Sequence, residues 1–410
     1  MSRIALRPCP MCGGREIDVL HRQALQQPAG SPLPDAYDVA DCLACGFVYA
    51  DTPATQQDYD RYYAVFSKYE DTAVASGRGI DALEAGRFEE TAAAIASRLG
   101  AAARILDIGC AGGGLLTALR RRGFTSLCGV DGAPGCVVSV RELGFEAHCL
   151  PLSRLQELND SGPFDGIVLS HVLEHVADVH PLMTAVAALA APDGRIYLET
   201  PDAARYADHP YVPFYFFDSE HINHFDPRQL GVLGARFGLA EEAVGERTIA
   251  VAPGKYYPAA WAWLRKSSVP AAARAEAHTG LGAAVRRYVA QCHAMPASPV
   301  LQRLALAGTP VVVWGAGSFA QRVFGQGGLR ACRVVAIVDR DRNKQGLQFA
   351  GRTIEAPEVA LARHPEAVVL VLAAIHGAAI AQEVRTLSHD ARVEMLDDSP
   401  PGSAEGQNTP

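Results

Sequence analysis

Four cysteines near the start of the sequence are spaced like the ligands of a metal ion. They form two pairs, Cys9 with Cys12 and Cys42 with Cys45; two residues separate the thiols of each pair, and a glycine follows. The spacer lets both thiolates of a pair face one ion, and the glycine permits a tight turn beneath them. Four protein thiolates complete a tetrahedral site without water, so we predict a structural Zn²⁺.

A glycine-rich turn suggests a second kind of chemistry. The segment LDIGCAGGG, residues 106–114, follows an apolar stretch typical of a strand and precedes a helical pattern. Glycines there let a ligand approach the backbone, and the helix N-terminus offers unpaired N–H groups. A second apolar stretch ends at Asp131, where a carboxylate suits ribose hydroxyls. These features predict a nucleotide site of the Rossmann type.

A carboxylate and a histidine stand side by side in the segment DSEHINHF, residues 218–225, which follows the aromatic stretch YVPFYFF. A histidine held by a carboxylate can accept a proton near neutral pH. The pair Glu220 and His221 is therefore a candidate for general-base catalysis. A structural hydrogen-bonded pair is the alternative interpretation.

The elements that must position these residues follow an α/β pattern. From Ala103 to about Ile249, short apolar segments alternate with helical ones, which is typical of a parallel sheet. The strands expected there are ARILDIG, LCGVDG, the segment near EAHCL, FDGIVLS and GRIYLETP. A second α/β unit starts at Pro310 with PVVVWGAG and continues through CRVVAIVDRD and EAVVLVLAAI.

Composition limits the classes of protein to which the chain can belong. The 410 residues carry 37 basic and 45 acidic side chains, a net charge of −8, which argues against binding nucleic acid through bulk charge. The longest apolar run, residues 367–375, is too short to span a bilayer, and no secretory signal is visible. We therefore expect a cytoplasmic enzyme, a monomer or homodimer, without a membrane or nucleic-acid partner. The six other cysteines are expected to be mostly core thiols.

The ordered series of motifs resembles the class I S-adenosylmethionine (SAM) methyltransferases. It comprises LDIGCAGGG, VDG at residues 130–132, FDGIVLSHVLEH at 164–175 and APDGRIYLETP at 191–201, with an alanine where the family usually has its second loop glycine. The resemblance implies that the loop holds the methionine part of SAM, Asp131 the ribose, and residues 152 and 153 the adenine. The residues it implies as SAM contacts are Asp107, Gly109, Cys110, Ala111, Asp131, Gly132, Leu152, Ser153, Ser170 and His171.

The whole chain resembles the deoxysugar C-methyltransferases of the tylosin mycarose C3-methyltransferase type, which methylate a nucleotide-linked 4-keto deoxysugar. The cysteine pairs, the Glu-His pair, WGAG at residues 314–317 and DRDRNKQG at 339–346 carry this resemblance. It implies that His221 is the general base and that Glu220 orients it. It also implies acceptor contacts from Tyr63, Tyr69 and His224, with Tyr62 a further candidate. Asp218 stands where the family has a tyrosine.

The fold class predicted is α/β, with an N-terminal zinc ribbon, a central Rossmann-like SAM methyltransferase domain and a C-terminal Rossmann-like domain. The expected boundaries are a ribbon at 1–53, a methyltransferase domain with N-terminal helices at 54–253, a helical connector at 254–304, the C-terminal domain at 305–398 and a disordered tail at 399–410.

Three alternatives stay open at this stage. The enzyme could be an O-methyltransferase of a saccharide or small natural product. It could also be a zinc-ribbon RNA methyltransferase, although the chain has no long basic run. The C-terminal glycine turn, followed by Asp339 after a second strand, has the form of a dinucleotide fingerprint. We expect that domain to close over the acceptor without a redox cofactor rather than to bind NAD.

Overall fold

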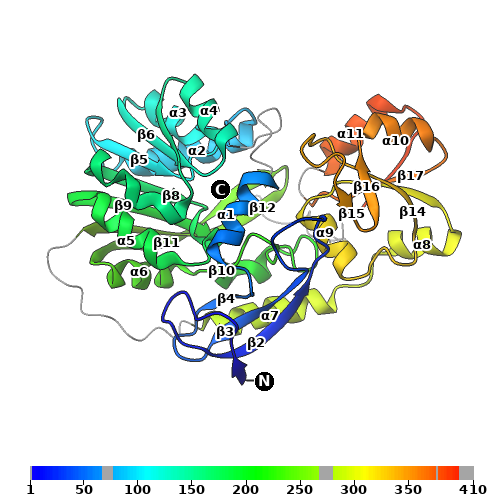
Figure 1. Cartoon of the computed structure of the whole chain (residues 1–410), viewed down its shortest axis with the longest axis horizontal. Helices are drawn as coiled ribbons and strands as arrows, with labels where there is room; N and C mark the ends of the chain where they lie inside the picture. Colours follow the sequence, from blue (N-terminus) through cyan, green and yellow to red (C-terminus); the bar gives the residue numbers. More distant parts are fainter. Residues whose placement is uncertain (1, 67–76, 267–279, 375–376, 397–410) are drawn as a thin grey trace, which may run out of the picture.

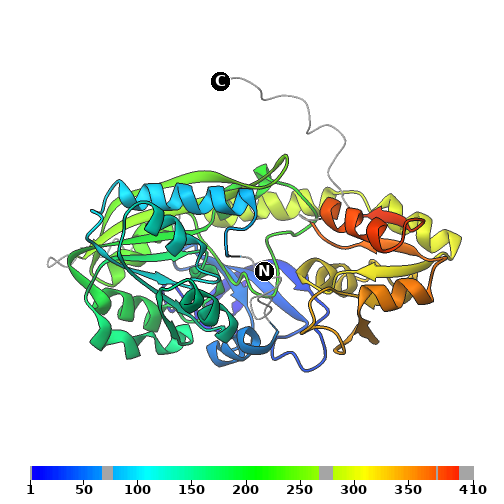
Figure 2. The ribbon, with the colours of Figure 1, turned by 90° about the horizontal axis from the view of Figure 1, so that it is seen from above.

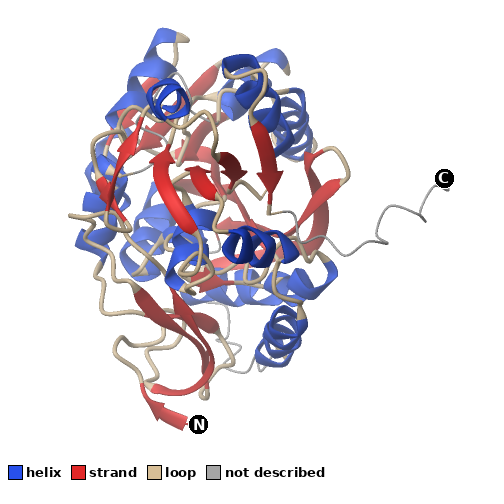
Figure 3. Cartoon of the chain, turned by 90° about the vertical axis from the view of Figure 1, so that its right-hand side faces the viewer, coloured by secondary structure: helices blue, strands red, loops and turns tan. Residues whose placement is uncertain are grey.

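The computed structural model describes residues 2–66, 77–266, 280–374 and 377–396, and its strands form three sheets. Figures 1 and 2 show the N-terminal sheet, in blue, between a large sheet in cyan to green and a C-terminal sheet in yellow to red. Figure 3 shows helices on both sides of the strands. Tyr69 and the tail at 399–410 lie outside the described residues. Among the described residues, every helix is too short or too polar to cross a membrane.

The N-terminal sheet is antiparallel and has five strands. In spatial order these are β1 (Ser2–Ile4), β2 (Glu16–Ala24), β3 (Ala36–Cys42), β4 (Val48–Asp51) and β10 (Asn223–His224). The last strand comes from a distant part of the chain, where Asn223 pairs with Tyr49 and His224 with Val48. The segment that contains the Glu-His pair therefore enters this sheet directly.

The large sheet has seven strands and contains all five strands expected from the sequence. Its spatial order is β11 (Leu239–Ala252), β12 (Lys255–Lys266), β9 (Ala190–Pro201), β8 (Phe164–Ser170), β5 (Arg104–Ile108), β6 (Ser126–Asp131) and β7 (Glu146–Cys149). Strands β5 to β9 are parallel, and β11 and β12 add an antiparallel hairpin. The carboxyl ends of β5, β6 and β8 thus meet at one edge, where ligands of such sheets bind.

Helices cover both faces of the large sheet and bury its apolar side chains. One core contains side chains of α2 (Ala82–Ala96), α3 (Gly114–Arg121) and α4 (Pro134–Glu142). The other contains those of the 3₁₀ segment η1 (Leu152–Ser161), α5 (Val179–Leu189) and α6 (Pro227–Arg236). Two short 3₁₀ segments, η2 (Leu173–His175) and η3 (Ala203–Asp208), follow β8 and β9. Before the sheet, α1 (Gln56–Val65) begins with a capping box between Thr55 and Asp58.

The predicted helical connector at 254–304 is wrong in its first part. Residues Lys255–Lys266 form β12, which pairs with β9 on one side and β11 on the other. The alanine-rich composition suggested a helix, but pairing on both sides satisfies the backbone, and the sheet overrides intrinsic propensity. Helices are found only later in this stretch, as α7 (Leu281–Ala294) and α8 (Pro299–Ala307).

The C-terminal sheet contains the three strand segments expected there. Its order is β15 (Gln348–Phe349), β16 (Arg352–Glu355), β14 (Arg333–Val338), β13 (Pro310–Trp314), β17 (Val368–Val371) and β18 (Arg392–Met395). Its helices are α9 (Ser318–Gly325), α10 (Pro357–Arg363) and α11 (Gly377–Leu387).

Helix α9 of the C-terminal unit contacts the segment that follows β2 of the N-terminal sheet. The backbone N–H of Gln26 donates to the carbonyl of Gln321, 2.8 Å away. A Cβ on Gly325 would lie 2.5 Å from backbone atoms of Leu25, so only glycine permits this approach. The middle and the end of α9 are therefore packed closely against the segment after β2.

Candidate active site

The turn between β5 and α3 is held by the carboxylate at the end of β6. Asp131 accepts the N–H of Ala111 on Oδ2 and that of Ala133 on Oδ1, both at 2.9 Å. Ala111 has a φ of 43°, in the left-handed region where glycine is favoured, so the alanine is tolerated at some strain. The Cys110 thiol is buried and points away from the turn: a Cβ on Gly129 would lie 2.7 Å from its Sγ.

A short segment missed by sequence analysis covers this turn. The carbonyl of Gly77 accepts the N–H of Gly114 at the start of α3, at 2.7 Å. A Cβ on Gly77 would lie only 2.6 Å from the Cβ of Ala111. Glu84 fixes the segment because its carboxylate accepts the N–H groups of Gly77 and Gly79. The signal available in the sequence was the pair of glycines at 77 and 79.

Asp107, at the end of β5, is a fully buried carboxyl group beside this turn. Burial, together with the nearby charge of Asp131, raises the pKa of Asp107 to about 8. Burial also raises the pKa of Asp131, against the hydrogen bonds that its carboxylate accepts from the backbone. A cationic ligand placed at the turn would therefore favour the ionised forms of these two carboxyls.

The residues predicted to contact adenine lie near the same edge of the sheet. The N–H of Leu150, just before Leu152 and Ser153, donates to the carbonyl of Asp131 at 3.0 Å. The Oγ of Ser153 donates to Asp60 of α1 at 2.6 Å. A Cβ on Gly132 would have Pro151 3.6 Å away. The structure thus brings the glycine turn, Asp131 and the start of η1 together.

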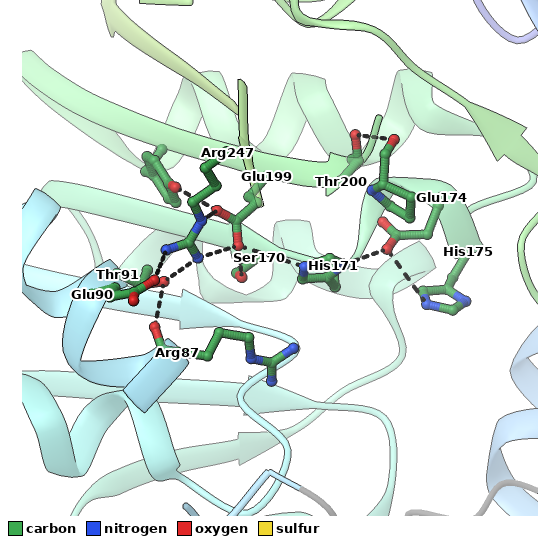
Figure 4. Close-up of polar contacts among 12 residues, drawn as sticks. Arg87, Glu90, Thr91, Ser170, His171, Glu174, His175, Glu199, Thr200 and Arg247 are labelled. Atoms are coloured by element: carbon green, nitrogen blue, oxygen red, sulfur yellow. Dashed lines mark hydrogen bonds and ion pairs between the residues drawn. The ribbon is translucent and has the colours of Figure 1, made fainter. Parts of the chain in front are cut away.

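A chain of buried charges begins beside the turn, after β8. A Cβ on Gly109 would lie 2.7 Å from Cγ2 of Val172, so the glycine turn and the segment after β8 touch. His171 has Nδ1 3.2 Å from Glu174 and Nε2 3.5 Å from Glu199 (Figure 4). Burial alone would lower the pKa of His171, but hydrogen bonds and charges from both carboxylates outweigh it and raise the pKa. The two carboxylates on either side of His171 therefore favour its protonated form.

Glu199 is balanced by an arginine that sequence analysis missed. Glu199 is fully buried, and Arg247 of β11 places Nε 2.7 Å from its Oε2 (Figure 4). Glu199 also accepts hydrogen bonds from Tyr197 and Ser170. Burial would raise the pKa of Glu199, but His171 and Arg247 lower it below its ordinary value. Two features of the sequence belong to this pair. One is a glutamate inside a buried strand, and the other is an arginine on β11, which lies two strands away in the sheet.

His221 lies at the other end of this chain of charges. One ligand atom each from Glu174, His175 and His221 lies within 4.8 Å of the others, a spacing that would also admit a metal ion. The His221 Nδ1 is 4.0 Å from Oδ2 of Asp218, and its ring packs edge-on against that of His175. Burial would raise the pKa of Asp218, but the charges of His221 and Arg322 lower it. Asp218 thus faces the His221 imidazole as a carboxylate.

Glu220, the tyrosines and His224 of the predicted site each contact a defined partner. Oε1 of Glu220 accepts the hydroxyl of Tyr62 at 3.3 Å, whereas the hydroxyl of Tyr63 lies 2.9 Å from Nδ1 of His175. His224 is fully buried, its Nδ1 is 3.2 Å from the Tyr206 hydroxyl, and burial lowers its pKa to about 3. His224 therefore lies in an aromatic core as a neutral ring.

The loop that carries His221 is fixed by several backbone contacts. The N–H of Ile222 donates to the carbonyl of Glu174, and the side chain of Asn223 donates to the carbonyls of Leu173 and Val176. Arg7 spans the same region, because its guanidinium donates to the carbonyls of Ala50, Ala177 and Ile222. The N-terminal sheet and η2 thereby set the position of His221.

The four cysteines of the predicted zinc site lie close together, and the first of them, Cys9, follows Arg7 by two residues. Their Sγ atoms lie within 4.8 Å of one another, with Cys9 3.7 Å from Cys45 and Cys12 3.5 Å from Cys42. Four sulfurs about 2.3 Å from a tetrahedral Zn²⁺ would be about 3.8 Å apart, so the donor set fits this ion. All four are free thiols, and the N–H groups of Gly13 and Gly46 close the two turns onto the carbonyls of Cys9 and Cys42.

Comparison with known proteins agrees with this geometry. Residues 83–244 match the family described as "Methyltransferase domain". Residues 83–244 are thus similar to a methyltransferase domain. Ubiquinone biosynthesis O-methyltransferase of Xanthomonas oryzae pv. oryzae is 31% identical over 150 residues, 35% of this chain and 61% of that protein. The Xylella fastidiosa protein of the same name is 37% identical over 103 residues, 24% and 42% of the two chains.

Solved structures are similar to about half of the chain. The 1,6-didemethyltoxoflavin-N1-methyltransferase of Burkholderia thailandensis, with bound S-adenosylhomocysteine, is 19% identical with a TM-score of 0.39, over 54% of this chain and 95% of that one. Magnesium protoporphyrin IX methyltransferase of Synechocystis PCC 6803, with bound SAM, is 15% identical with a TM-score of 0.34, over 45% and 81%. The resemblance to deoxysugar C-methyltransferases stays a prediction.

The pair formed by Glu199 and Arg247 should contribute strongly to stability. Replacing Glu199→Gln leaves a largely buried guanidinium without its main anion, so the free energy of unfolding at pH 7 should fall by about 3 kcal/mol in chemical denaturation. Glu90→Gln is the matched control, because Glu90 contacts the same arginine at 3.2 Å but is 66% exposed. That variant should lose less than about 1 kcal/mol.

The effect of Glu199→Gln should also depend on pH. Because the pKa of Glu199 is lowered on folding, its stabilisation is complete above the ordinary value of 4.5 and is lost as the pH falls through the folded pKa. The difference between variant and wild type should therefore shrink in acid. A constant difference would contradict the ion-pair explanation.

Proposed function

We propose that the protein transfers a methyl group from SAM to a nucleotide-linked sugar, with His221 as the general base. The observation that carries this proposal is the line of charged groups from the glycine turn to His221. Val172, beside Gly109, and Glu174, beside His221, belong to one short segment after β8. A donor at the turn and an acceptor at His221 would therefore meet at the carboxyl ends of the parallel strands.

The residues present fit the cofactor. The glycine turn offers backbone groups, Asp131 and Asp107 offer acidic charge, and residues 152 and 153 lie at the same edge for adenine. When bound, SAM supplies an electrophilic methyl group on a positively charged sulfur. The protein has to hold the acceptor and remove its proton.

The side chains around His221 suit proton removal. With Nδ1 facing Asp218, the Nε2 atom is available to accept a proton from the acceptor. Asp218, and Glu174 on the other side, would stabilise the imidazolium that forms. Asp218 takes the orienting role that the resemblance gave to Glu220, since the Glu220 carboxylate contacts Tyr62.

A carbon acid next to a 4-keto group is the acceptor favoured by the family resemblance. There His221 would remove the proton at C3, and the resulting enolate would attack the methyl carbon. The named relatives, which are O-methyltransferases, favour a second candidate in which His221 deprotonates a hydroxyl group. These reactions are separated by incubating a nucleotide-linked 4-keto-6-deoxyhexose with the protein in D₂O and S-adenosylhomocysteine. Deuterium at C3 supports the carbon acid, and its absence favours the O-methyl reaction.

The substitution His221→Asn should reduce kcat by at least about 100-fold, because the asparagine amide cannot accept the proton. Affinity for S-adenosylhomocysteine, measured by calorimetry, should change no more than a few-fold. His180→Asn is the control, since His180 is an exposed histidine on α5. If the His221 variant kept its activity, the general-base assignment would be wrong.

The affinity for SAM should depend on the ionisation of Asp107. Because its pKa is about 8 in the free protein, the amino and sulfonium charges of SAM must displace a proton from it. Affinity should rise from about pH 6 to about pH 8 and then level off, with release of up to one proton. Calorimetry in two buffers of different ionisation enthalpy measures this release. Asp107→Asn should abolish it, whereas the exposed control Asp160→Asn should not.

We also propose that the four cysteines bind one structural Zn²⁺. Elemental analysis of the purified protein should find about one zinc per chain. Cys42→Ser should lose most of the metal and lower the Tm by more than about 5 °C, because a structural zinc site contributes directly to folding. Cys149→Ser, at an exposed cysteine of β7, should change neither. A metal-free wild-type protein with unchanged Tm would contradict the zinc assignment.

A further inference from the structure

Arg322 is a buried cation on helix α9, where the C-terminal sheet meets the rest of the molecule. Its side chain is only 2% exposed. The guanidinium carbon lies 5.9 Å from the ring centre of Tyr215 and 5.8 Å from that of Phe319. Tyr215 belongs to the aromatic stretch that leads into the His221 loop. Arg322 therefore points from the C-terminal unit toward the proposed active site.

The guanidinium has no anionic partner among the residues that the structure describes. Its Nε and Nη1 atoms are buried without a hydrogen-bond partner. An arginine does not lose its proton in a protein, and a buried, unpaired charge costs several kcal/mol. The two ring contacts offset only part of this cost. Such a group is satisfied when an anion binds it.

The charge of Arg322 lowers the pKa of Asp218, but the carboxylate oxygens of Asp218 already interact with other groups. Its Oδ1 accepts the N–H groups of Glu220 and His221, and its Oδ2 faces the His221 ring. The charges of both His221 and Arg322 act on Asp218. The hydrogen bond between Ser219 and Gln321 joins the residues that follow Asp218 and precede Arg322, so the His221 loop and the arginine lie next to each other.

Helix α9 is held firmly in this position. The hydroxyl of Ser219 donates to Oε1 of Gln321 at 2.8 Å, and Nε2 of Gln27 donates to the same hydroxyl at 2.8 Å. All three side chains are buried, and they join the N-terminal sheet, the His221 loop and α9. The arginine next to Gln321 is therefore fixed before any ligand arrives, which lowers the entropic cost of binding.

We propose that Arg322 binds the diphosphate of the acceptor and is the residue through which the C-terminal unit selects a nucleotide-linked substrate. This inference rests on the proposed function and names the part of the substrate that the protein recognises. A planar guanidinium forms paired, charge-assisted hydrogen bonds with phosphate oxygens. Tyr215 and Phe319 flank the guanidinium and leave its nitrogen atoms for the anion.

The test uses inorganic pyrophosphate and uridine diphosphate as probes, titrated calorimetrically into the full-length protein saturated with S-adenosylhomocysteine. Wild type should bind both probes, and Arg322→Gln should weaken both at least tenfold. Arg322→Lys, which keeps the charge but loses the paired geometry, should fall between them. Arg330→Gln is the control, because Arg330 is an exposed arginine of the same unit. S-adenosylhomocysteine affinity should be equal in all four proteins.

The variant Asp218→Asn keeps the proposal falsifiable if Arg322→Gln does not fold. Removing the neighbouring negative charge should strengthen pyrophosphate binding if Arg322 receives the anion. Weaker or unchanged binding, together with a lower Tm, would show instead that Arg322 serves Asp218 as an internal ion pair and would overturn the proposal. So would a wild-type protein that binds neither probe. A protein that binds pyrophosphate but not S-adenosylhomocysteine would contradict the proposed function. The pyrophosphate affinities of the wild type and the variants would still decide whether Arg322 binds the anion.

Discussion

The pairing of β10 with β4 is the constraint on which the arrangement of the site depends. Two residues, Asn223 and His224, extend an N-terminal sheet whose other strands lie more than 170 positions earlier. This short strand fixes the backbone directly after His221. Arg7 reinforces the pairing, because it donates to carbonyls on both sides of it. Without this sheet, the His221 loop would lack the backbone partners that hold it beside Glu174.

The four cysteines contribute to the same constraint. Cys9 follows Arg7 by two residues, and Cys42 ends β3, which pairs with β4. Cys9, Cys42 and Phe47 share one apolar core with Phe225 and with strand residues of the large sheet. A metal ion at the cysteines would therefore rigidify the sheet that positions the proposed base. On this view the N-terminal unit belongs to the active site, although it contributes no reacting atom.

Charge balance governs the interior between the glycine turn and His221. His171 is held between Glu174 and Glu199, and Arg247 compensates the second of these carboxylates. Each of these buried charges has a partner of opposite sign, which is how a protein tolerates charges away from water. Arg322 differs because its partner is missing among the described residues. The contrast between the two arginines distinguishes an internal ion pair from a group that awaits a ligand.

The sequence by itself determined the local chemistry. It predicted the parallel strands, the glycine turn with Asp131 and the two cysteine pairs, because these depend on apolar periodicity and on spacing within a few residues. It also singled out His221 as a candidate base. It could not predict β12, since an alanine-rich strand paired on both sides resembles a helix in composition.

Only the tertiary structure decided which distant groups face one another. It placed Asp218 rather than Glu220 next to the His221 Nδ1, paired Arg247 with Glu199, and laid Gly77 over Ala111. These partners are separated from each other by strands, helices and whole sheets, so no local pattern encodes them. They are selected by the cost of burying a charge or a polar backbone group, which is settled only when the complete chain has packed.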